Sequence, residues 1–181
     1  ILTTKVGSPL SIKNIREEMD VAHQSVENWI KILERLYVVF RIPPYGSPKI
    51  RAVKKEQKLY FWDWSIIEDP GVRLENMLAC QLLKYCHFLE DTEGHRMELR
   101  FLRDVDKREI DFVVLKNKKP LFAVECKTGE KSPSQAAAYF RARTQIPKFY
   151  QIHLKNREWG NAEEDVAILP YKRFVEIENM P

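Results

Sequence analysis

The sequence lacks any long hydrophobic run, since its longest apolar stretches cover only a few of its 181 residues. A helix that spans a bilayer needs ~20 consecutive apolar residues, so we expect no membrane segment. Residues 1–5 have neither the basic nor the apolar region of a secretory signal. Cysteine is also scarce: Cys80, Cys86 and Cys126 form no C-x-x-C pair, which argues against a disulfide framework and against a zinc site. A cytoplasmic protein fits these absences.

Two further patterns are missing. The four histidines are scattered, so no H-x-x-x-H pair of metal ligands occurs. No G-x-x-x-x-G-K-S/T run occurs either, so we expect no phosphate-binding loop of the kind found in ATPases. The chain does not begin with Met, and we expect it to be part of a longer protein.

Basic residues are concentrated in the N-terminal third. The formal charge of the chain is +4, from 30 Lys and Arg against 26 Asp and Glu. Residues 1–60 hold 11 Lys and Arg against 6 Asp and Glu, a net of +5, which leaves −1 for the remainder. This distribution is a modest indication of nucleic-acid binding.

The first 60 residues predict two helices and a β-hairpin. Ser11 suits the N-cap of the first helix, and the second helix covers about residues 22–36. Residues 38–42 and 58–62 resemble strands, with a Pro- and Gly-rich turn at 43–48. The expected apolar faces are Ile12, Ile15 and Met19 in the first helix, and Val26, Trp29, Ile30, Leu33 and Leu36 in the second.

This order of elements predicts a winged helix-turn-helix over residues 1–65. Its second helix is neutral and poor in the side chains that read bases, so sequence-specific contacts are not indicated. The ribbon is better suited to DNA phosphates. Packing against another domain of the longer protein is the alternative. The residues expected to contact DNA are Arg41, Lys49, Arg51, Lys54, Lys55 and Lys58.

Residues 70–181 predict a second domain. A helix after Asp69-Pro70-Gly71 carries its apolar stripe on one side, and strand-like runs follow at 97–102, 109–115, 121–127, 148–154 and 166–169. Between the third and fourth runs, Ser132, Pro133 and Gln135 suit the first turn of a helix, as N-cap, first-turn proline and capping-box residue. The order indicates an α/β fold, a mixed sheet flanked by helices. The helix stripe consists of Leu74, Met77, Leu78, Leu82 and Tyr85.

The second and third of these strands form a hairpin with charged residues at its open end. If the turn is centred on Lys118, Asp111 lies opposite Glu125, where like charges repel. Strict alternation would put Asp111, Glu125 and Lys127 on one face and Ile110, with its apolar neighbours, on the other. Both faces are otherwise apolar, which is typical of interior strands.

A divalent cation would explain this arrangement. Asp111, Glu125 and a main-chain carbonyl near Cys126 offer the hard oxygen ligands that Mg²⁺ prefers, and Mn²⁺ would suit them too. Such a metal lowers the pKa of a bound water, and Lys127 could stabilise developing phosphate charge. Each residue alone is more often part of an exposed ion pair. The combination on paired apolar strands favours the metal site.

The chain resembles the PD-(D/E)xK nuclease superfamily, which has a restriction-endonuclease-like fold. The resemblance rests on Asp111, on the run Val124-Glu125-Cys126-Lys127 and on a leading helix that carries Glu75. The runs 58–63, 73–76, 108–113 and 124–127 are also similar to the C-terminal module of bacterial and archaeal AAA-type ATPases. That resemblance covers nearly the whole chain and implies an ATPase domain upstream, a winged helix next and a nuclease-like domain, residues 70–181, at the end.

The resemblance also implies roles for single residues. Glu75 matches the acid of the leading helix and would join Asp111 and Glu125 as a metal ligand, while Lys127 matches the catalytic lysine. An acid early in a helix is also favoured by the helix dipole alone. Gln135 and Tyr139 match a motif that contacts the site in RecB-like nucleases, although the capping box alone accounts for Gln135.

Two functional classes remain open. The first is a Mg²⁺-dependent DNA endonuclease, and the second is a non-cleaving DNA-binding or regulatory module of the ATPase that keeps the nuclease scaffold. The sequence leaves open whether the protein forms a homo-oligomer and whether its substrate is DNA or RNA.

Overall fold

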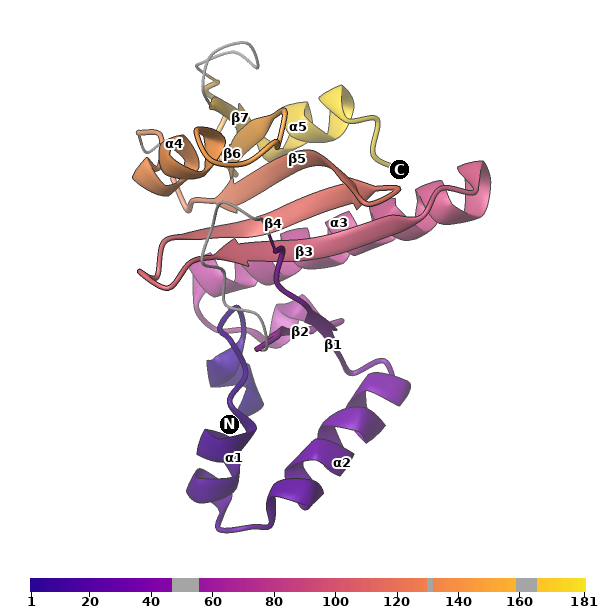
Figure 1. Cartoon of the computed structure of the whole chain (residues 1–181), viewed down its shortest axis with the longest axis vertical. Coiled ribbons are helices and arrows are strands. Elements are labelled where there is room, and N and C mark those ends of the chain that lie inside the picture. The colour runs from indigo at the N-terminus through magenta and orange to yellow at the C-terminus, as the bar shows by residue number, and fades with distance from the viewer. Residues whose placement is uncertain (47–55, 130–131, 159–165) are drawn as a thin grey trace.

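The computed structural model describes residues 1–46, 56–129, 132–158 and 166–181. Figure 1 shows a five-stranded sheet with helices on both faces, and a smaller part, built from the N-terminal residues, on the far side of the longest helix. The smaller part contains two short 3-10 helices, η1 and η2, two α-helices and a two-stranded sheet. Its elements are η1 (Leu2–Lys5), α1 (Ile12–Met19), α2 (His23–Arg35), β1 (Val39–Ile42), β2 (Lys58–Phe61) and η2 (Trp64–Ile66).

The first two helices begin and end where the sequence predicts. The Ser11 hydroxyl caps α1 by accepting a hydrogen bond from the amide of Asn14 at 3.3 Å, and α1 ends at Asp20 in the left-handed region. Helix α2 is bounded by Ala22 and Leu36. Its expected apolar face is only partly buried, because Trp29 is 42% and Leu36 65% exposed. Only Val26 and Ile30 of that face are buried.

The larger part is a mixed sheet in the order β3-β4-β5-β6-β7. Strands β3, β4 and β5 are antiparallel neighbours, and β6 and β7 continue the sheet in parallel. All five strands lie within one or two residues of their predicted positions. The elements are α3 (Pro70–Glu93), β3 (Met97–Arg103), β4 (Glu109–Lys116), β5 (Lys119–Cys126), α4 (Gln135–Arg141), β6 (Phe149–His153), β7 (Ala167–Pro170) and α5 (Tyr171–Ile177).

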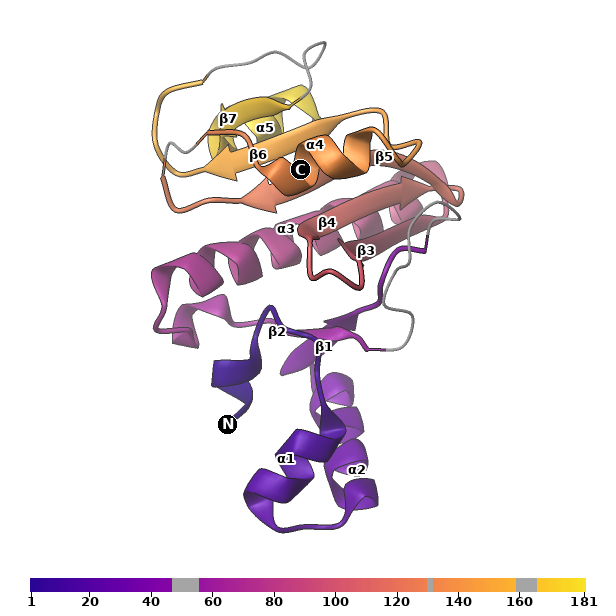
Figure 2. The ribbon, with the colours of Figure 1, turned by 60° about the vertical axis from the view of Figure 1, so that its left-hand side comes forward.

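Two apolar cores lie on the two faces of this sheet. One joins α3, α5 and the smaller part, and includes Phe112, Val124 and Phe174. The other lies beneath α4 and includes Val113 and Ala123. Because adjacent strand residues alternate between the cores, both faces are covered, as the apolar strands predict. Figures 1 and 2 agree that α3 lies between the smaller part and the sheet.

Three details differ from the sequence-based expectation. The β4–β5 turn is only two residues long, because Asn117 and Lys118 both adopt positive φ, as tight hairpins require. Helix α4 starts two residues later than expected, so Ser134 caps it in place of Ser132. Helix α5 was not predicted, because its seven residues, Tyr171–Ile177, carry no side-chain cap. Among the described residues, no helix is long and apolar enough to cross a membrane.

Asn76 links the two parts of the molecule. Its fully buried side chain accepts a hydrogen bond from the amide of Phe61 at 2.9 Å and donates one to the carbonyl of the same residue at 2.6 Å. The α3 side chain therefore satisfies both main-chain groups at the end of β2, in the way that a neighbouring strand would.

Replacing Asn76 with Ala should therefore destabilise the chain by about 2–4 kcal/mol, since the amide of Phe61 loses its partner and the carbonyl keeps only the weak thiol donor of Cys80. Chemical denaturation measures this change. Gln81→Ala, a polar truncation on the same helix, is the control and should cost under ~1 kcal/mol. Equal effects of the two substitutions would show that the Asn76 contacts add nothing beyond helix packing.

Candidate functional site

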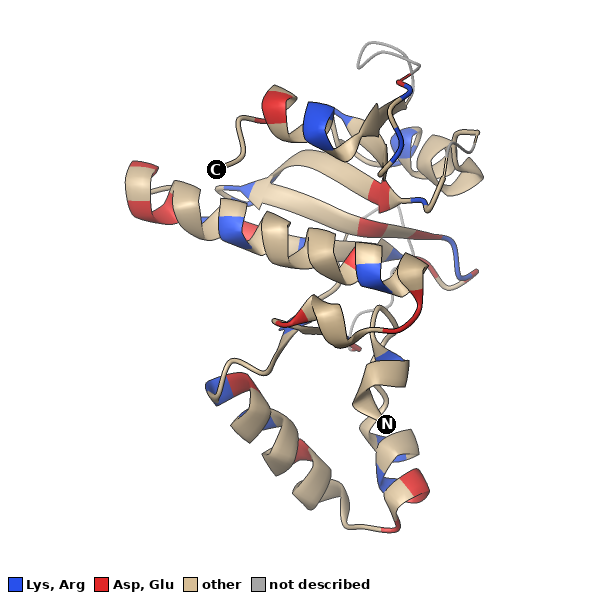
Figure 3. Cartoon of the chain, turned by 180° about the vertical axis from the view of Figure 1, so that it is seen from behind, with Lys and Arg blue, Asp and Glu red and all other residues tan. Residues whose placement is uncertain are grey.

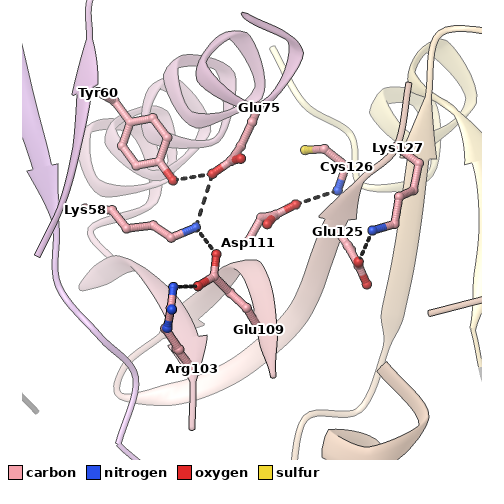
Figure 4. A network of polar contacts seen from close by, with 9 residues as sticks. All are labelled: Lys58, Tyr60, Glu75, Arg103, Glu109, Asp111, Glu125, Cys126 and Lys127. Carbon is pink, nitrogen blue, oxygen red and sulfur yellow. Dashed lines mark hydrogen bonds and ion pairs between the residues drawn. The ribbon is translucent and has the colours of Figure 1, made fainter. Parts of the chain in front are cut away.

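The predicted charged residues lie at one end of the sheet. Asp111 is near the start of β4, Glu125 is near the end of β5, and Lys127 directly follows β5. Glu75 lies in the second turn of α3. Figure 4 shows these side chains together with five others, from β2, β3, β4 and β5. Residues far apart in the sequence thus meet at the site.

The predicted hairpin register is correct, but the predicted common face is wrong. Phe112 pairs with Val124, so the next pair outward would be Asp111 and Glu125. Against β3, however, the register shifts between Arg100 and Leu102. Asp111 and Phe112 of β4 therefore both lie opposite one residue of β3, Phe101.

This β-bulge changes the direction of Asp111. Ile110 packs in the α4-side core instead of beside Phe112, and Asp111 is directed to the α3 side. Glu125 keeps the alternation with Ala123 and Val124, which places it on the α4 side. The two carboxylates therefore approach the end of β5 from its two sides. They still interact, since the β4–β5 ladder ends at Phe112 and Val124 and leaves both residues beyond it.

The carboxyl group of Asp111 has a raised pKa. One oxygen, Oδ2, accepts a hydrogen bond from the amide of Cys126 at 2.7 Å, in place of a ladder carbonyl. Burial, followed by the charge of Glu75, raises the pKa of Asp111 to about 8, although Lys58 and the Cys126 amide act in the opposite direction. A carboxyl with such a pKa is largely protonated at neutral pH unless a further cation comes close.

Glu75 is held by the smaller part of the molecule. Its Oε1 accepts hydrogen bonds from the hydroxyl of Tyr60 at 2.7 Å and from the ammonium of Lys58 at 3.2 Å. Gly7, at a φ of +71°, passes so close that a Cβ there would lie 3.0 Å from Oε1. Glu75 is therefore held by specific contacts with Lys58, Tyr60 and Gly7, and is not a solvated residue at the start of a helix.

Lys58 does not lie on the surface of the ribbon. Its side chain is fully buried, with the ammonium 3.2 Å from Oε1 of Glu75 and 2.5 Å from Oε1 of Glu109. Arg103 binds the other oxygen of Glu109 at 2.7 Å. Burial opposes the charge of Lys58, but Glu75, Asp111 and Glu109 outweigh it and raise the pKa. The prediction that Lys58 contacts DNA phosphates is therefore wrong, because its side chain is fully buried.

Glu125 and Lys127 form an ion pair that is mostly shielded from solvent. Oε1 of Glu125 contacts the ammonium of Lys127, and the side-chain exposures are 8% and 31%. The second oxygen, Oε2 of Glu125, is buried and has no hydrogen-bond partner among the residues that the structure describes. Burial lowers the pKa of Lys127, but its hydrogen bond to Glu125 and the charge of that residue raise it more. The exposed ion pair considered from the sequence is therefore not what forms.

A cleft of about 340 Å³ opens beside these residues, between the start of α3 and the end of β5. Glu75, Asp111 and Lys127 line its wall, and Glu125 lies behind it. The rest of the wall comes from the N-terminal turn of α3 and from the segment after β5. These lining residues are Asp69, Gly71, Val72, Leu74, Cys126 and Thr128.

The donor set fits a divalent cation by its chemistry, although it is not assembled as a cage. In the part of the chain that the structure describes, no three His, Cys, Asp or Glu side chains converge closely enough to hold a metal ion. Two observations favour a cation nonetheless: Oε2 of Glu125 is buried without a hydrogen-bond partner in the described ranges, and the pKa of Asp111 is raised. Carboxylate oxygens are the ligands that Mg²⁺ prefers, and it keeps several waters.

The other candidate residues lie in different surroundings. Gln135 is exposed at the start of α4, where Ser134 makes the cap, so the capping box is not formed. The ring of Tyr139 lies between two guanidinium groups, with that of Arg108 at 3.9 Å and that of Arg143 at 4.0 Å from its centre. Tyr139 and Gln135 are not among the residues that line the cleft.

Of the basic residues expected to contact DNA, only two are placed. Arg41 makes two hydrogen bonds to Glu34, at 2.6 and 2.8 Å, and Lys58 is buried as described. The remaining candidates, Lys49, Arg51, Lys54 and Lys55, lie outside the described residues. Seen from behind, α1 and α2 carry both blue and red segments, so neither helix is uniformly basic (Figure 3).

Sequence reasoning missed four members of the network: Tyr60, Arg103, Glu109 and the interior role of Lys58. A signal existed for two of them. Glu109 is two residues before Asp111 on the same strand, and Lys58 opens a strand whose other residues are all apolar. Tyr60 and Arg103 had no local signal, since their roles depend on partners far away in the sequence.

Two family models match the chain. One, described as a domain of unknown function (DUF8612), matches residues 1–69. The other, described as a domain of unknown function (DUF4143), matches residues 70–174. The chain is also 23% identical over 188 residues to "Uncharacterized protein MJ1637" of Methanocaldococcus jannaschii. That match covers 97% of the chain but only 37% of the relative's length. No solved structure matches the chain.

Proposed function

The chain belongs to the DUF4143 family of domains of unknown function, and we propose that it is a divalent-metal-dependent nuclease module that hydrolyses DNA phosphodiesters. In this proposal residues 70–181 have the PD-(D/E)xK fold and residues 1–65 form a winged helix. The observation that carries it is the cleft in which Glu75, Asp111 and Lys127 meet, with the unpartnered Oε2 of Glu125 behind them. An upstream ATPase domain in the longer protein is part of the same proposal.

The residues have distinct roles in this proposal. Asp111 and Glu125 would hold Mg²⁺ or Mn²⁺, with Glu75 as the third acid. When bound, such a metal polarises the phosphate and lowers the pKa of a water molecule. Lys127 would place its ammonium near the phosphate, where it could stabilise developing negative charge. Lys127 forms an ion pair with Glu125, so this ion pair would have to break for Glu125 to bind a metal.

The direct test is a cleavage assay. The chain is incubated with duplex, branched and single-stranded DNA, and with RNA, in the presence of Mg²⁺ or Mn²⁺. We expect cleavage of at least one DNA substrate, none in EDTA and a strong loss of cleavage in Asp111→Asn. Asp91→Asn, the same substitution at an exposed position on α3, is the control and should keep wild-type activity. Cleavage that persists in EDTA would refute the metal-dependent mechanism.

A second candidate function is a non-cleaving DNA-binding or regulatory module of the ATPase. The specific observation in its favour is the exposed apolar side of α2, where Trp29, Ile32 and Leu36 are 42%, 51% and 65% exposed. An apolar helix face suits packing against another domain better than contact with phosphates. Wild-type protein that binds DNA but neither binds divalent ions nor cleaves would support this candidate.

The proposed DNA contact through the ribbon can be tested by charge reversal. Lys54→Glu combined with Lys55→Glu should weaken DNA binding and flatten its salt dependence. Each phosphate contact contributes ~0.9 to the log–log slope, so the loss of two should lower the slope by about 1.8. Fluorescence anisotropy at several salt concentrations measures it. Reversal of Lys118 and Lys119, at the β4–β5 turn, makes the same change of charge elsewhere. An equal loss of slope in both variants would mean that the ribbon makes no particular contact.

A further inference from the structure

Lys58 places a buried ammonium among the acids of the site. Lys58 comes from β2 in the smaller part, yet its side chain is fully buried between two acids of the larger part, Glu75 and Glu109. The ring of Phe101 lies 5.5 Å from the ammonium and closes the surroundings on another side. A lysine is rarely buried to this extent unless it is paired.

The charges around Lys58 nearly balance without any added ion. Three acids, Glu75, Glu109 and Asp111, face the two cations Lys58 and Arg103. If all three acids are ionised, the cluster has one negative charge in excess. One divalent cation would more than compensate that excess, and a second would leave a large positive charge in a partly buried site. Burying uncompensated charge is costly.

We infer that Lys58 takes the place of a second cation, so that the proposed site binds one divalent ion and not two. The inference rests on the proposed function, because it concerns the metal content of the same site. Lys58 sets the number of bound ions in this proposal, because it donates to Oε1 of Glu75 from the side of the smaller part. The cleft side of Glu75 remains for the single metal ion beside Asp111.

The oxygen geometry supports this division. Oε1 of Glu75 already accepts from both Lys58 and Tyr60, and both oxygens of Glu109 are bound, one by Lys58 and one by Arg103. The two oxygens that contact the ammonium, Oε1 of Glu75 and Oε1 of Glu109, are therefore held by it, and a metal ion between the two acids would compete with the ammonium for them. If the ammonium is removed, two acids face each other without a cation between them, and a divalent ion becomes their natural replacement.

The test counts the bound ions. Isothermal titration with Mn²⁺ on the full chain should give one ion per chain for the wild type and two for Lys58→Met. Tyr60→Phe removes a hydrogen bond to the same oxygen without changing the charge, and should stay at one ion. The double variant Lys58→Met/Glu109→Gln removes one charge of each sign, and should also stay at one.

Lys58→Met is expected to lose stability without metal, because Glu75 and Glu109 are left unpaired. It should then fold when refolded in Mn²⁺, and metal analysis after gel filtration should count two ions. A wild type that binds two ions, a Lys58→Met chain that binds one, or a Lys58→Met chain that fails to fold in Mn²⁺ each overturns the inference while leaving the nuclease proposal intact. A wild type that binds no Mn²⁺ overturns both.

Discussion

Replacing Asp111 with Asn is expected to reduce DNA cleavage about a hundredfold or more while DNA binding is retained. The reason is that a metal contributes several kcal/mol of transition-state stabilisation, and each ~1.4 kcal/mol changes the rate tenfold. Asn keeps the shape of Asp111 and can still accept the hydrogen bond from the Cys126 amide through its carbonyl oxygen. It lacks the negative charge that would attract the cation.

The same substitution should not destabilise the metal-free protein at neutral pH. The folded-state pKa of Asp111 is raised to about 8 from an ordinary value of 3.8, mainly by burial and then by Glu75. For a carboxyl whose pKa is raised on folding, its contribution to stability is fully present below about pH 4 and is lost as the pH rises through about 8. Asn does not titrate. The stability of Asp111→Asn relative to the wild type should therefore rise steadily as the pH increases from about 4 to about 8.

Denaturation in EDTA at several pH values between about 4 and 9 measures this difference, with Asp91→Asn as the control. Added Mn²⁺ should stabilise the wild type and have little effect on Asp111→Asn. If Asp111→Asn is less stable than the wild type at pH 8 in EDTA, then Asp111 is a structural residue that holds the end of β5, and the proposed role as metal ligand fails.

Replacing Lys127 with Met should give the opposite pattern. It removes the cation paired with Glu125, whose second oxygen has no hydrogen-bond partner in the part of the chain that the structure describes. The metal-free protein should lose about 1–3 kcal/mol, less than the ~3–5 kcal/mol typical of a broken fully buried pair, because Lys127 is partly exposed. Cleavage should fall strongly, since the ammonium near the phosphate is lost.

Metal binding separates this variant from Asp111→Asn. The acids remain in Lys127→Met, so Mn²⁺ should bind at least as tightly as in the wild type and should restore much of the lost stability. Lys119→Met, at the exposed start of β5, is the control and should alter neither property. If Lys127→Met cleaves DNA as fast as the wild type does, Lys127 has no part in the mechanism.

Local signals predicted most of the secondary structure. The cap at Ser11, the start of α3 at Asp69 and the five strands all follow from nearby residues and alternation. Where two local signals compete, prediction was less exact: Ser132 and Ser134 are both good N-caps, and the structure uses Ser134. The two-residue turn at Asn117 and Lys118 was placed correctly but predicted to be too long.

The sequence brought Asp111 and Glu125 together but predicted neither the directions of their side chains nor the residues that surround them. The register that puts Asp111 opposite Glu125 depends on the hairpin alone, so the sequence could provide it. The β-bulge that turns Asp111 toward α3 depends on pairing with β3, which no local pattern reveals. The interior position of Lys58 depends on Glu75 and Glu109, which lie 17 and 51 positions further along the chain.

The most direct test of the proposed metal site is to locate the ion. Crystals of the chain soaked in Mn²⁺ should show an anomalous difference peak in the cleft, within about 2–2.5 Å of a carboxylate oxygen of Asp111. Glu125 should be turned from Lys127 toward the same ion, and the peak should be absent in Asp111→Asn. A site that stays without an anomalous peak at saturating Mn²⁺, or a peak that persists unchanged in Asp111→Asn, would contradict the proposal that these acids hold a catalytic metal.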